Sequence, residues 1–304
     1  MGHNNPTIAE WIRIVIMPGM MLSLAMASYV RVCFRFIREG QILAPFLQAS
    51  KIRDEAFGKF WVQLSAMQPK INMEEESKDP SEMNSSDLIP PLLARASGVV
   101  LDIGPGTGTQ MPLLSKQHAP GIRTIYGPEP CRHLHAALHE AVAEHGLTEV
   151  YTVLPCGVAA NELLPALAGQ GIVPAERTLD EIARQGGLFD TIVCVRVLCS
   201  VPDLEATLSD LYALLRPGGQ ILVTEHTVNP WRGGKGSLVA RAMQVVYTFL
   251  GWSYFMGDCA LNRDTERALR GVADRDGGWD LVELDAWFGN STLPYIAGRL
   301  VKRL

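Results

Sequence analysis

The sequence lacks the features of a nucleic-acid-binding or disulfide-stabilised protein. Its 27 Lys and Arg residues are outnumbered by 32 Asp and Glu residues, giving a formal net charge of −5. No basic stripe with interleaved aromatic residues is present, so we expect no nucleic-acid partner. The six cysteines form no CxxC pair, which favours a reducing intracellular compartment over a disulfide framework.

Metal-ligand spacing is also missing from the histidines. His133, His135 and His139 lie on one predicted helix, and the last two have i, i+4 spacing. No partnering ligand pattern accompanies them. We therefore expect no metal site.

Residues 14–30 carry no charged side chain. The length of this run is near the lower limit for a helix that spans a bilayer. The pair at 18–19, Pro-Gly, interrupts the run, and no A-x-A cleavage site follows. A basic helical face comes next, formed by Arg31, Arg35 and Arg38. We expect residues 1–40 to be an apolar helical anchor at a membrane surface, or alternatively a lid over the site or a helix that binds a partner.

The rest of the chain divides into three parts. Residues 41–68 predict an amphipathic helix, because Phe57, Phe60, Trp61 and Leu64 follow helical spacing. Residues 69–97 begin with an acidic, Ser-rich and Pro-punctuated stretch, which indicates a linker or flap. Residues 98–304 then form the main folded domain.

Strand-like and helix-like runs alternate in residues 98–304, which predicts a doubly wound, Rossmann-like α/β sheet. We expect helices from the glycine-rich turn to about 117, over 132–144, within the insertion 161–187, and from Asp203 to Arg216. The last two of seven strands have no full crossover between them and should pair as an antiparallel hairpin. The predicted strands are 99–103, 124–127, 151–154, 189–198, 220–226, 281–288 and 295–302.

A glycine-rich turn joins the first predicted strand to the first predicted helix. Glycines let the backbone approach a ligand closely, and a helix N-terminus behind them offers free N–H groups and a positive dipole end. The turn lacks the third glycine of GxGxxG and follows an acidic residue, which argues against a nicotinamide dinucleotide. Glu129, which closes the second strand, is placed to accept both hydroxyls of a ribose. The turn reads Asp102, Ile103, Gly104, Pro105, Gly106, Thr107 and Gly108.

With D-x-G-x-G-x-G, the strand-end acid and L-R-P-G-G in order, residues 98–225 resemble class I S-adenosylmethionine-dependent methyltransferases. The segments VCVRVLCSV, GDCALNRDT and LPYIAGRLVK resemble more specifically the methyltransferase-like seven group, membrane-associated alkyl thiol methyltransferases. The resemblance implies S-adenosylmethionine as cofactor, with its carboxypropyl end over residues 104–108 and its ammonium on Asp102. It also implies that Gly157, Val158 and Arg196 contact the cofactor.

One departure concerns the adenine. Members of the family usually carry an acidic residue after the third strand, whereas this chain reads Cys156-Gly157-Val158-Ala159. Backbone groups would then have to hold the adenine. We expect the missing acidic residue to affect how tightly the cofactor binds more than which cofactor binds.

The acceptor is expected to be a small hydrophobic molecule, and a thiol is favoured because it is partly ionised at neutral pH. His226, at the end of the fifth strand, is the candidate group to accept or orient its proton. O- or C-methylation, a methyltransferase fold repurposed for binding or rearrangement, and a membrane-recruitment module remain as alternatives. The candidate acceptor-binding residues are Cys199, Trp231, Tyr254 and Cys259.

Overall fold

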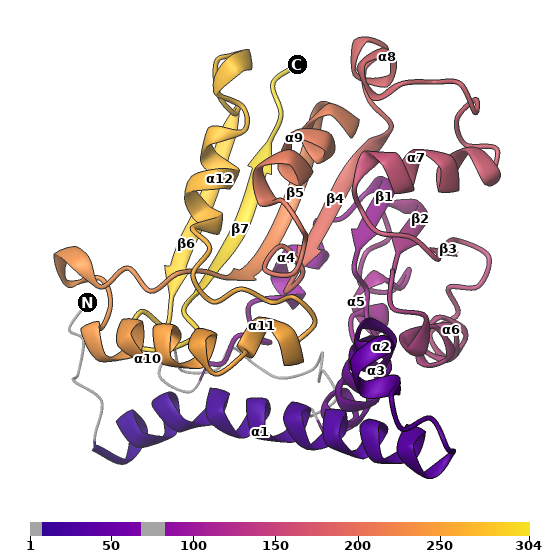
Figure 1. The fold of residues 1–304 in the computed structure, drawn as a ribbon. Helices are drawn as coiled ribbons and strands as arrows, with labels where there is room; N and C mark the ends of the chain where they lie inside the picture. Colours follow the sequence, from indigo (N-terminus) through magenta and orange to yellow (C-terminus); the bar gives the residue numbers. More distant parts are fainter. Residues whose placement is uncertain (1–7, 68–82) are drawn as a thin grey trace.

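The computed structural model describes residues 8–67 and 83–304 and contains one seven-stranded sheet (Figure 1). The strand order is β3-β2-β1-β4-β5-β7-β6. Neighbouring strands from β3 to β5 run parallel, and β7 pairs antiparallel with both β5 and β6. The predicted doubly wound sheet with a C-terminal hairpin is therefore confirmed. The strands are β1 Gly98–Ile103, β2 Ile122–Pro128, β3 Tyr151–Leu154, β4 Phe189–Val195, β5 Leu215–His226, β6 Leu281–Trp287 and β7 Tyr295–Val301.

Helices cover both faces of the sheet, because its central strands are apolar on both sides. One core packs α7, α8, α9 and α12 on one face. A second core packs α4, α5 and α6 on the other. The bounds are α4 Pro90–Leu93, α5 Met111–Leu114, α6 His135–Glu144, α7 Ala160–Gly169, α8 Leu179–Arg184, α9 Leu204–Leu214 and α12 Thr265–Gly271, with 3-10 turns η1 Arg132–Leu134, η2 Arg232–Gly234 and η3 Asp274–Asp276.

Two helices begin with caps that their sequences encode locally. The Thr178 hydroxyl accepts from the Glu181 backbone N–H, and the Glu181 side chain returns the bond, so α8 begins with a full capping box. Asp203 caps α9 by accepting from the Ala206 backbone N–H at 2.9 Å. The helix ends at Leu214, two residues before the predicted end, because Leu215 already takes the extended backbone of β5.

The helix after the glycine-rich turn is much shorter than predicted. α5 is a single turn, since Ser115 is extended and the His118 ring bonds the Pro90 carbonyl oxygen at 2.9 Å. A four-residue helix has little aligned dipole. The prediction of a helix dipole behind the glycines is therefore wrong. The backbone N–H groups of the turn itself remain as hydrogen-bond donors.

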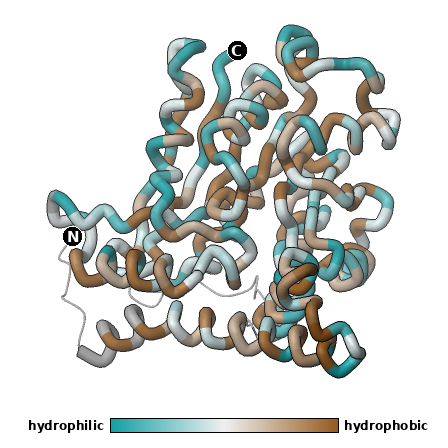
Figure 2. The backbone as a smooth tube through the Cα atoms, viewed as in Figure 1, coloured by the Kyte–Doolittle hydropathy of each residue, from teal (hydrophilic) through white to brown (hydrophobic). Residues whose placement is uncertain are grey.

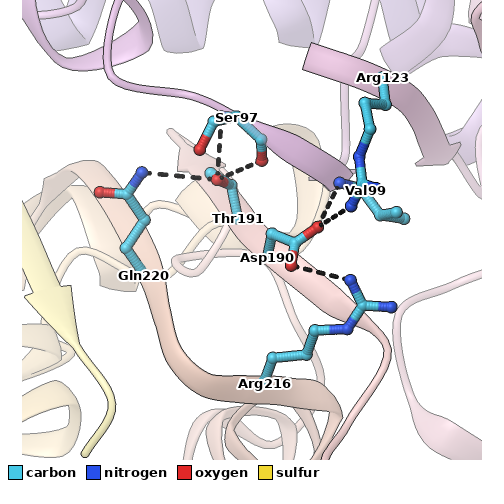
Figure 3. Close-up of polar contacts among 7 residues, drawn as sticks. All are labelled: Ser97, Val99, Arg123, Asp190, Thr191, Arg216 and Gln220. Atoms are coloured by element: carbon cyan, nitrogen blue, oxygen red, sulfur yellow. Dashed lines mark hydrogen bonds and ion pairs between the residues drawn. The ribbon is translucent and has the colours of Figure 1, made fainter. Parts of the chain in front are cut away.

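The amino edge of the sheet is tied together by Asp190 (Figure 3). Its Oδ2 accepts from the Val99 backbone N–H at 2.7 Å and from Arg123 at 2.9 Å, and its Oδ1 accepts from Arg216 at 2.8 Å. Burial alone would raise the pKa of Asp190, but these donors lower it. The cluster joins β1, β2, β4 and β5 at the edge opposite to their carboxyl ends.

The N-terminal region, together with residues 238–255, forms a helical layer across the carboxyl end of the sheet (Figures 1 and 2). Contrary to the predicted interruption, α1 is continuous through Pro18. Gly19 lets the Tyr247 ring approach, since a Cβ there would lie 2.9 Å from the Tyr247 hydroxyl oxygen. The layer contains α1 Ile8–Arg38, α2 Ala44–Leu47, α3 Ala49–Met67, α10 Leu238–Phe249 and α11 Trp252–Phe255.

The region predicted as one amphipathic helix, residues 41–68, contains α2 and the longer α3, which packs against α1. Arg35, predicted to face an anionic surface, instead donates to Glu55 of α3 at 2.6 Å, and Lys59 bonds the other oxygen of Glu55 at 2.7 Å. A carboxylate this deeply buried needs such partners. The Arg35–Glu55 pair fastens α1 to α3, and the Lys59–Glu55 pair lies within α3.

The predicted linker at 69–97 is only partly described. Residues 68–82, which carry its most acidic stretch, lie outside the described residues. Residues 83–97 belong to the folded domain, because Ile89 and Leu93 are fully buried in the second core. The proposed boundary at residue 98 therefore falls inside a packed region.

Gly58 of α3 tests how tightly this layer sits on the domain. A Cβ at Gly58 would lie 2.5 Å from the His133 Cβ, whereas nothing lies within 4 Å of a Cβ at Gly169 in α7. Gly169→Ala should be neutral or stabilise by up to about 1 kcal/mol through helix propensity. Gly58→Ala should lower the free energy of unfolding by about 1–3 kcal/mol through overpacking. Urea unfolding of both variants checks this, and equal stabilisation would contradict the packing of α3 on η1.

Candidate functional site

A cavity of about 2210 Å³ lies at the carboxyl edge of the sheet. Its floor comes from the ends of β1, β2, β4 and β5 and the loops that follow them, where ligands bind in open α/β sheets. Its roof comes from α1, α3 and α11, with Met21, Phe57, Trp61 and Trp252 among the apolar lining residues. The N-terminal segment therefore covers the site, as the lid alternative predicted.

Asp102 ends β1 and lines the cavity with a buried carboxyl group. The Tyr151 hydroxyl donates to its Oδ2 at 2.8 Å. Burial raises the pKa of Asp102 to about 7, against the hydrogen bond from Tyr151, which lowers it. The pKa of Tyr151 is raised well above its ordinary value by burial, so its hydroxyl stays a donor. Gly127 makes this contact possible, because a Cβ at that position would overlap the Tyr151 hydroxyl.

Glu129 follows β2 and is equally buried. Its Oε2 accepts from the Gly106 backbone N–H at 2.9 Å and its Oε1 from the Cys131 N–H at 2.8 Å. Burial raises the pKa of Glu129, and these two backbone donors lower it in part. Each carboxylate oxygen keeps a further lone pair that can accept from a ligand hydroxyl. The bonds also fix the glycine-rich turn relative to β2.

The glycine-rich turn requires glycine at the predicted positions. Gly104 and Gly106 have positive φ angles of 57° and 63°. A Cβ at Gly104 would overlap Val197, and one at Gly106 would lie 3.2 Å from the Trp61 indole nitrogen. Gly104 and Gly106 line the cavity, whereas Thr107 and Gly108 lie behind it, Gly108 against Ala141 and Leu138 of α6.

Two residues of the loop after β3 that the sequence assigned to the cofactor, Gly157 and Val158, line the cavity. The Gly157 N–H donates to Glu162 at 2.8 Å. The chain thus brings an acid, Glu162, to this loop from the first turn of α7. Sequence reasoning missed Glu162 because its proximity depends on where α7 begins.

Arg196 comes directly after β4 and lines the cavity with a positive φ of 57°. Its Nη2 donates to the hydroxyls of Ser85 and Ser86, each at 2.9 Å. Its guanidinium also stands 5.8 Å from the centre of the Tyr295 ring. Arg196 therefore joins the cavity floor to residues that the sequence assigned to a linker.

The acceptor side of the cavity gathers three predicted residues into one cluster. Cys199, His226 and Cys259 offer ligand atoms that all lie within 4.8 Å of one another. The His226 Nε2 is 3.1 Å from the Cys259 Sγ, and the Trp252 indole N–H donates to the same sulfur at 3.2 Å. The buried His226 Nδ1 has no hydrogen-bond partner among the described residues. All four side chains line the cavity.

Glu225, next to His226, has a structural task. Its Oε1 accepts from the backbone N–H groups of Val197 and Leu198 at 2.8 and 3.0 Å. Burial raises its pKa to about 7. These bonds hold the loop after β4, and thereby Cys199, against the end of β5.

Two predicted acceptor-binding residues do not line the cavity. Trp231 is 40% exposed, with the Arg232 guanidinium 4.8 Å from its ring centre. Tyr254 donates its hydroxyl to the Tyr29 hydroxyl at 2.9 Å and so fastens α11 to α1. Trp61 and Trp252 line the cavity instead, whereas Tyr151 acts on it only through its hydrogen bond to Asp102. Only the helical stripe containing Trp61 gave a signal, because it indicated a helix that must pack on something.

Comparisons with known proteins agree with this geometry. A family model described as a methyltransferase domain matches residues 79–284. Thiol S-methyltransferase TMT1B from Homo sapiens is 29% identical over 213 residues, which cover 68% of this chain and 71% of that protein.

Two solved structures have similar folds. The [4+2]-cyclase SpnF aligns with a TM-score of 0.54 and 13% identity, covering 84% of this chain and 96% of that one. Geranyl diphosphate C-methyltransferase from Streptomyces coelicolor A3(2), solved with S-adenosyl-L-homocysteine, aligns with a TM-score of 0.50 and 11% identity, covering 83% and 98%. The buried acids at the ends of β1 and β2 fit that cofactor, and the family match covers more than half of the chain. The chain belongs to the methyltransferase family and is an S-adenosylmethionine-dependent methyltransferase.

Proposed function

We propose that this enzyme transfers a methyl group from S-adenosylmethionine to the sulfur of a small hydrophobic thiol. The observation that carries the proposal is the cluster of Cys199, His226 and Cys259 on the acceptor side of the cavity. It offers soft sulfur and imidazole groups beneath an apolar roof, a suitable environment for a polarizable nucleophile. The similarity to a thiol S-methyltransferase over two thirds of the chain supports the same acceptor.

In this proposal each residue at the carboxyl edge of the sheet binds a different part of the cofactor. The Asp102 carboxylate pairs with the ammonium group, and Glu129 accepts from the ribose hydroxyls. The N–H groups of the glycine-rich turn face the carboxypropyl end, with Gly104 and Gly106 on the cavity wall and Thr107 and Gly108 supporting them from behind. Gly157 and Val158 contact the adenine, and Arg196 holds the loop at the end of β4.

The chemistry is an in-line displacement between a sulfonium and a nucleophile. Both reactants lose charge as they approach, so a cavity that orients them and excludes water supplies much of the acceleration. A thiol is already partly ionised near neutral pH. His226, with its Nδ1 unpartnered, is the group placed to accept or orient the remaining proton.

O- or C-methylation is the second candidate, and a specific observation separates it from the first. An alcohol does not ionise near neutral pH and would need a strong base, yet His226 is the only candidate base that the sequence placed here. A methyltransferase fold used for binding or rearrangement is the third candidate. The fold alone does not decide among them.

We predict that the purified enzyme converts S-adenosylmethionine to S-adenosylhomocysteine with alkyl thiols and not with the matched alcohols. The rate should rise with pH towards the pKa of each thiol, because the thiolate is the nucleophile. Mass spectrometry of the methylated acceptor and of S-adenosylhomocysteine checks this. Turnover of the alcohols alone would favour oxygen methylation, and cofactor binding without turnover of either series would favour a repurposed fold.

We also predict that cofactor affinity depends on the ionisation of Asp102. Since the pKa of this buried acid is about 7, the carboxyl group must lose a proton before it pairs with the ammonium group. Affinity for S-adenosylhomocysteine should therefore rise from pH 6 to pH 8, by up to about tenfold per unit below the pKa, and then level off.

Calorimetry over this pH range provides the measurement. Asp102→Asn should bind S-adenosylhomocysteine more weakly and lose most of the dependence of affinity on pH. Glu129→Gln should also bind more weakly, but it should keep the pH dependence that Asp102 causes. A flat wild-type profile would contradict the pairing of Asp102 with the ammonium group.

We further propose that α1, α2 and α10 lie along a membrane surface. Of the described helices, only the segment Ile16–Arg38 of α1 is long and apolar enough to cross a bilayer by length and composition. Its inner side packs on α3 and α11 and lines the cavity, which favours a helix lying flat. Large apolar side chains point outward on all three helices, and such surfaces mark interaction sites. They include Ile16, Val30 and Phe34 of α1, Phe46 and Leu47 of α2, and Val245 and Phe249 of α10.

Two exposed phenylalanines give a test of this surface. Phe46 is 83% exposed and Phe249 is 89% exposed, and neither lines the cavity. Replacing both by Asp should lower binding to phosphatidylcholine–phosphatidylserine vesicles by about tenfold or more, because each Phe contributes about 1.5–3 kcal/mol on burial. Leu304→Asp, at the fully exposed C-terminus, is the control. Equal flotation of the double variant and the wild type with vesicles would count against a membrane at this surface.

A further inference from the structure

The cluster of Cys199, His226 and Cys259 has more donor groups than acid–base chemistry requires. The three residues come from separate parts of the chain: the loop after β4, the end of β5, and the segment between α11 and α12. Cys199 and His226 are buried and Cys259 is half-buried, yet all three reach the cavity. Such convergence of soft donors on one point is the pattern of a metal site.

The separations fit tetrahedral coordination. Zinc bonds of about 2.3 Å to sulfur and 2.0–2.1 Å to nitrogen place neighbouring donors about 3.5–3.8 Å apart. The ligand atoms all lie within 4.8 Å of one another, and the His226 Nε2 is 3.1 Å from the Cys259 Sγ. Side-chain shifts of up to about an ångström would bring the three donors to the separations of a zinc site.

The surroundings also fit thiolate ligands. The Trp252 indole N–H donates to the Cys259 sulfur at 3.2 Å, and such outer hydrogen bonds orient ligands and stabilise their charge. Three protein ligands leave one position of a tetrahedron open. Because the cluster lines the cavity, that position faces the space available to the acceptor.

We propose that Cys199, His226 and Cys259 bind a zinc ion whose open position takes the sulfur of the acceptor. The two thiolates neutralise the charge of Zn²⁺, and His226 binds through Nε2. The metal, rather than a free His226 base, then lowers the pKa of the acceptor thiol. The spacing of the histidines predicted no metal site. It could not reveal this one, because the three donors come from distant segments of the chain.

The reaction balances without an oxidant or a reductant. The thiol loses its proton to solvent on binding zinc, and a sulfur lone pair forms the new S–CH3 bond. The methyl–sulfonium bond of S-adenosylmethionine breaks at the same time, leaving S-adenosylhomocysteine. The ion site stands on its own geometry, whereas its role towards a thiol rests on the proposed function.

Metal content of the full-length protein is the first test. The protein is purified without chelators, and zinc is measured by plasma mass spectrometry. We expect about one zinc per chain in the wild type and less than about a tenth of that in Cys199→Ser and Cys259→Ser. The control is Cys156→Ser, a half-buried thiol outside the cavity lining, which should keep its zinc. Binding of S-adenosylhomocysteine shows that each variant is folded.

A spectroscopic test reports the ligands directly. After zinc is removed, Co²⁺ should give the intense visible bands of a tetrahedral site and a thiolate charge-transfer band, both lost in Cys259→Ser. Adding 2-mercaptoethanol should change the charge-transfer band of the wild type. A weak six-coordinate spectrum, or equal zinc in the wild type and Cys259→Ser, would overturn the metal site.

Activity then separates the two proposals. If zinc binds as expected and no thiol is methylated, the metal site stands and the thiol function fails. If thiols are methylated equally before and after zinc removal, the thiol function stands and the role of the metal is overturned.

Discussion

The structure depends on the burial of two carboxyl groups at the carboxyl edge of the sheet. An ionised carboxylate is unfavourable in a buried position unless it has hydrogen-bond or ionic partners. Asp102 and Glu129 each have some of these partners. Tyr151 bonds one, and two backbone N–H groups bond the other. Burial raises the pKa of both groups. A cationic, hydroxyl-bearing cofactor would pair with both carboxylates, so these two acids would provide specificity.

Much of the fold could be predicted from local sequence signals. The strand order and the final hairpin follow from the alternation of apolar runs and helices, and the caps at Thr178 and Asp203 follow from local side-chain chemistry. The length of α5 could not be predicted, because it is set by the contact of His118 with Pro90 in another segment. The continuity of α1 through Pro18 likewise depends on tertiary packing.

The residues of the candidate site also fall into those that the sequence could predict and those that depend on tertiary packing. Asp102, the glycines and Glu129 stand at strand ends, where topology alone brings them together. Tyr151 reaches Asp102 only because Gly127 leaves room on the neighbouring strand, and Trp61 arrives from a helix outside the sheet. Trp231 and Tyr254 were placed in the site because their region often covers acceptors. Instead, Trp231 lies near Arg232 and Tyr254 holds α1.

The roof helix α1 also constrains how this protein can evolve. Met17, Met20 and Leu24 are about half exposed and also line the cavity, so one helix contributes to two surfaces. A mutation that reshapes the outer surface also reshapes the pocket wall, and selection cannot adjust one without the other. If the outer surface of α1 meets a membrane as proposed, membrane attachment and the choice of acceptor are inherited together, as a single trait carried by a few turns of helix.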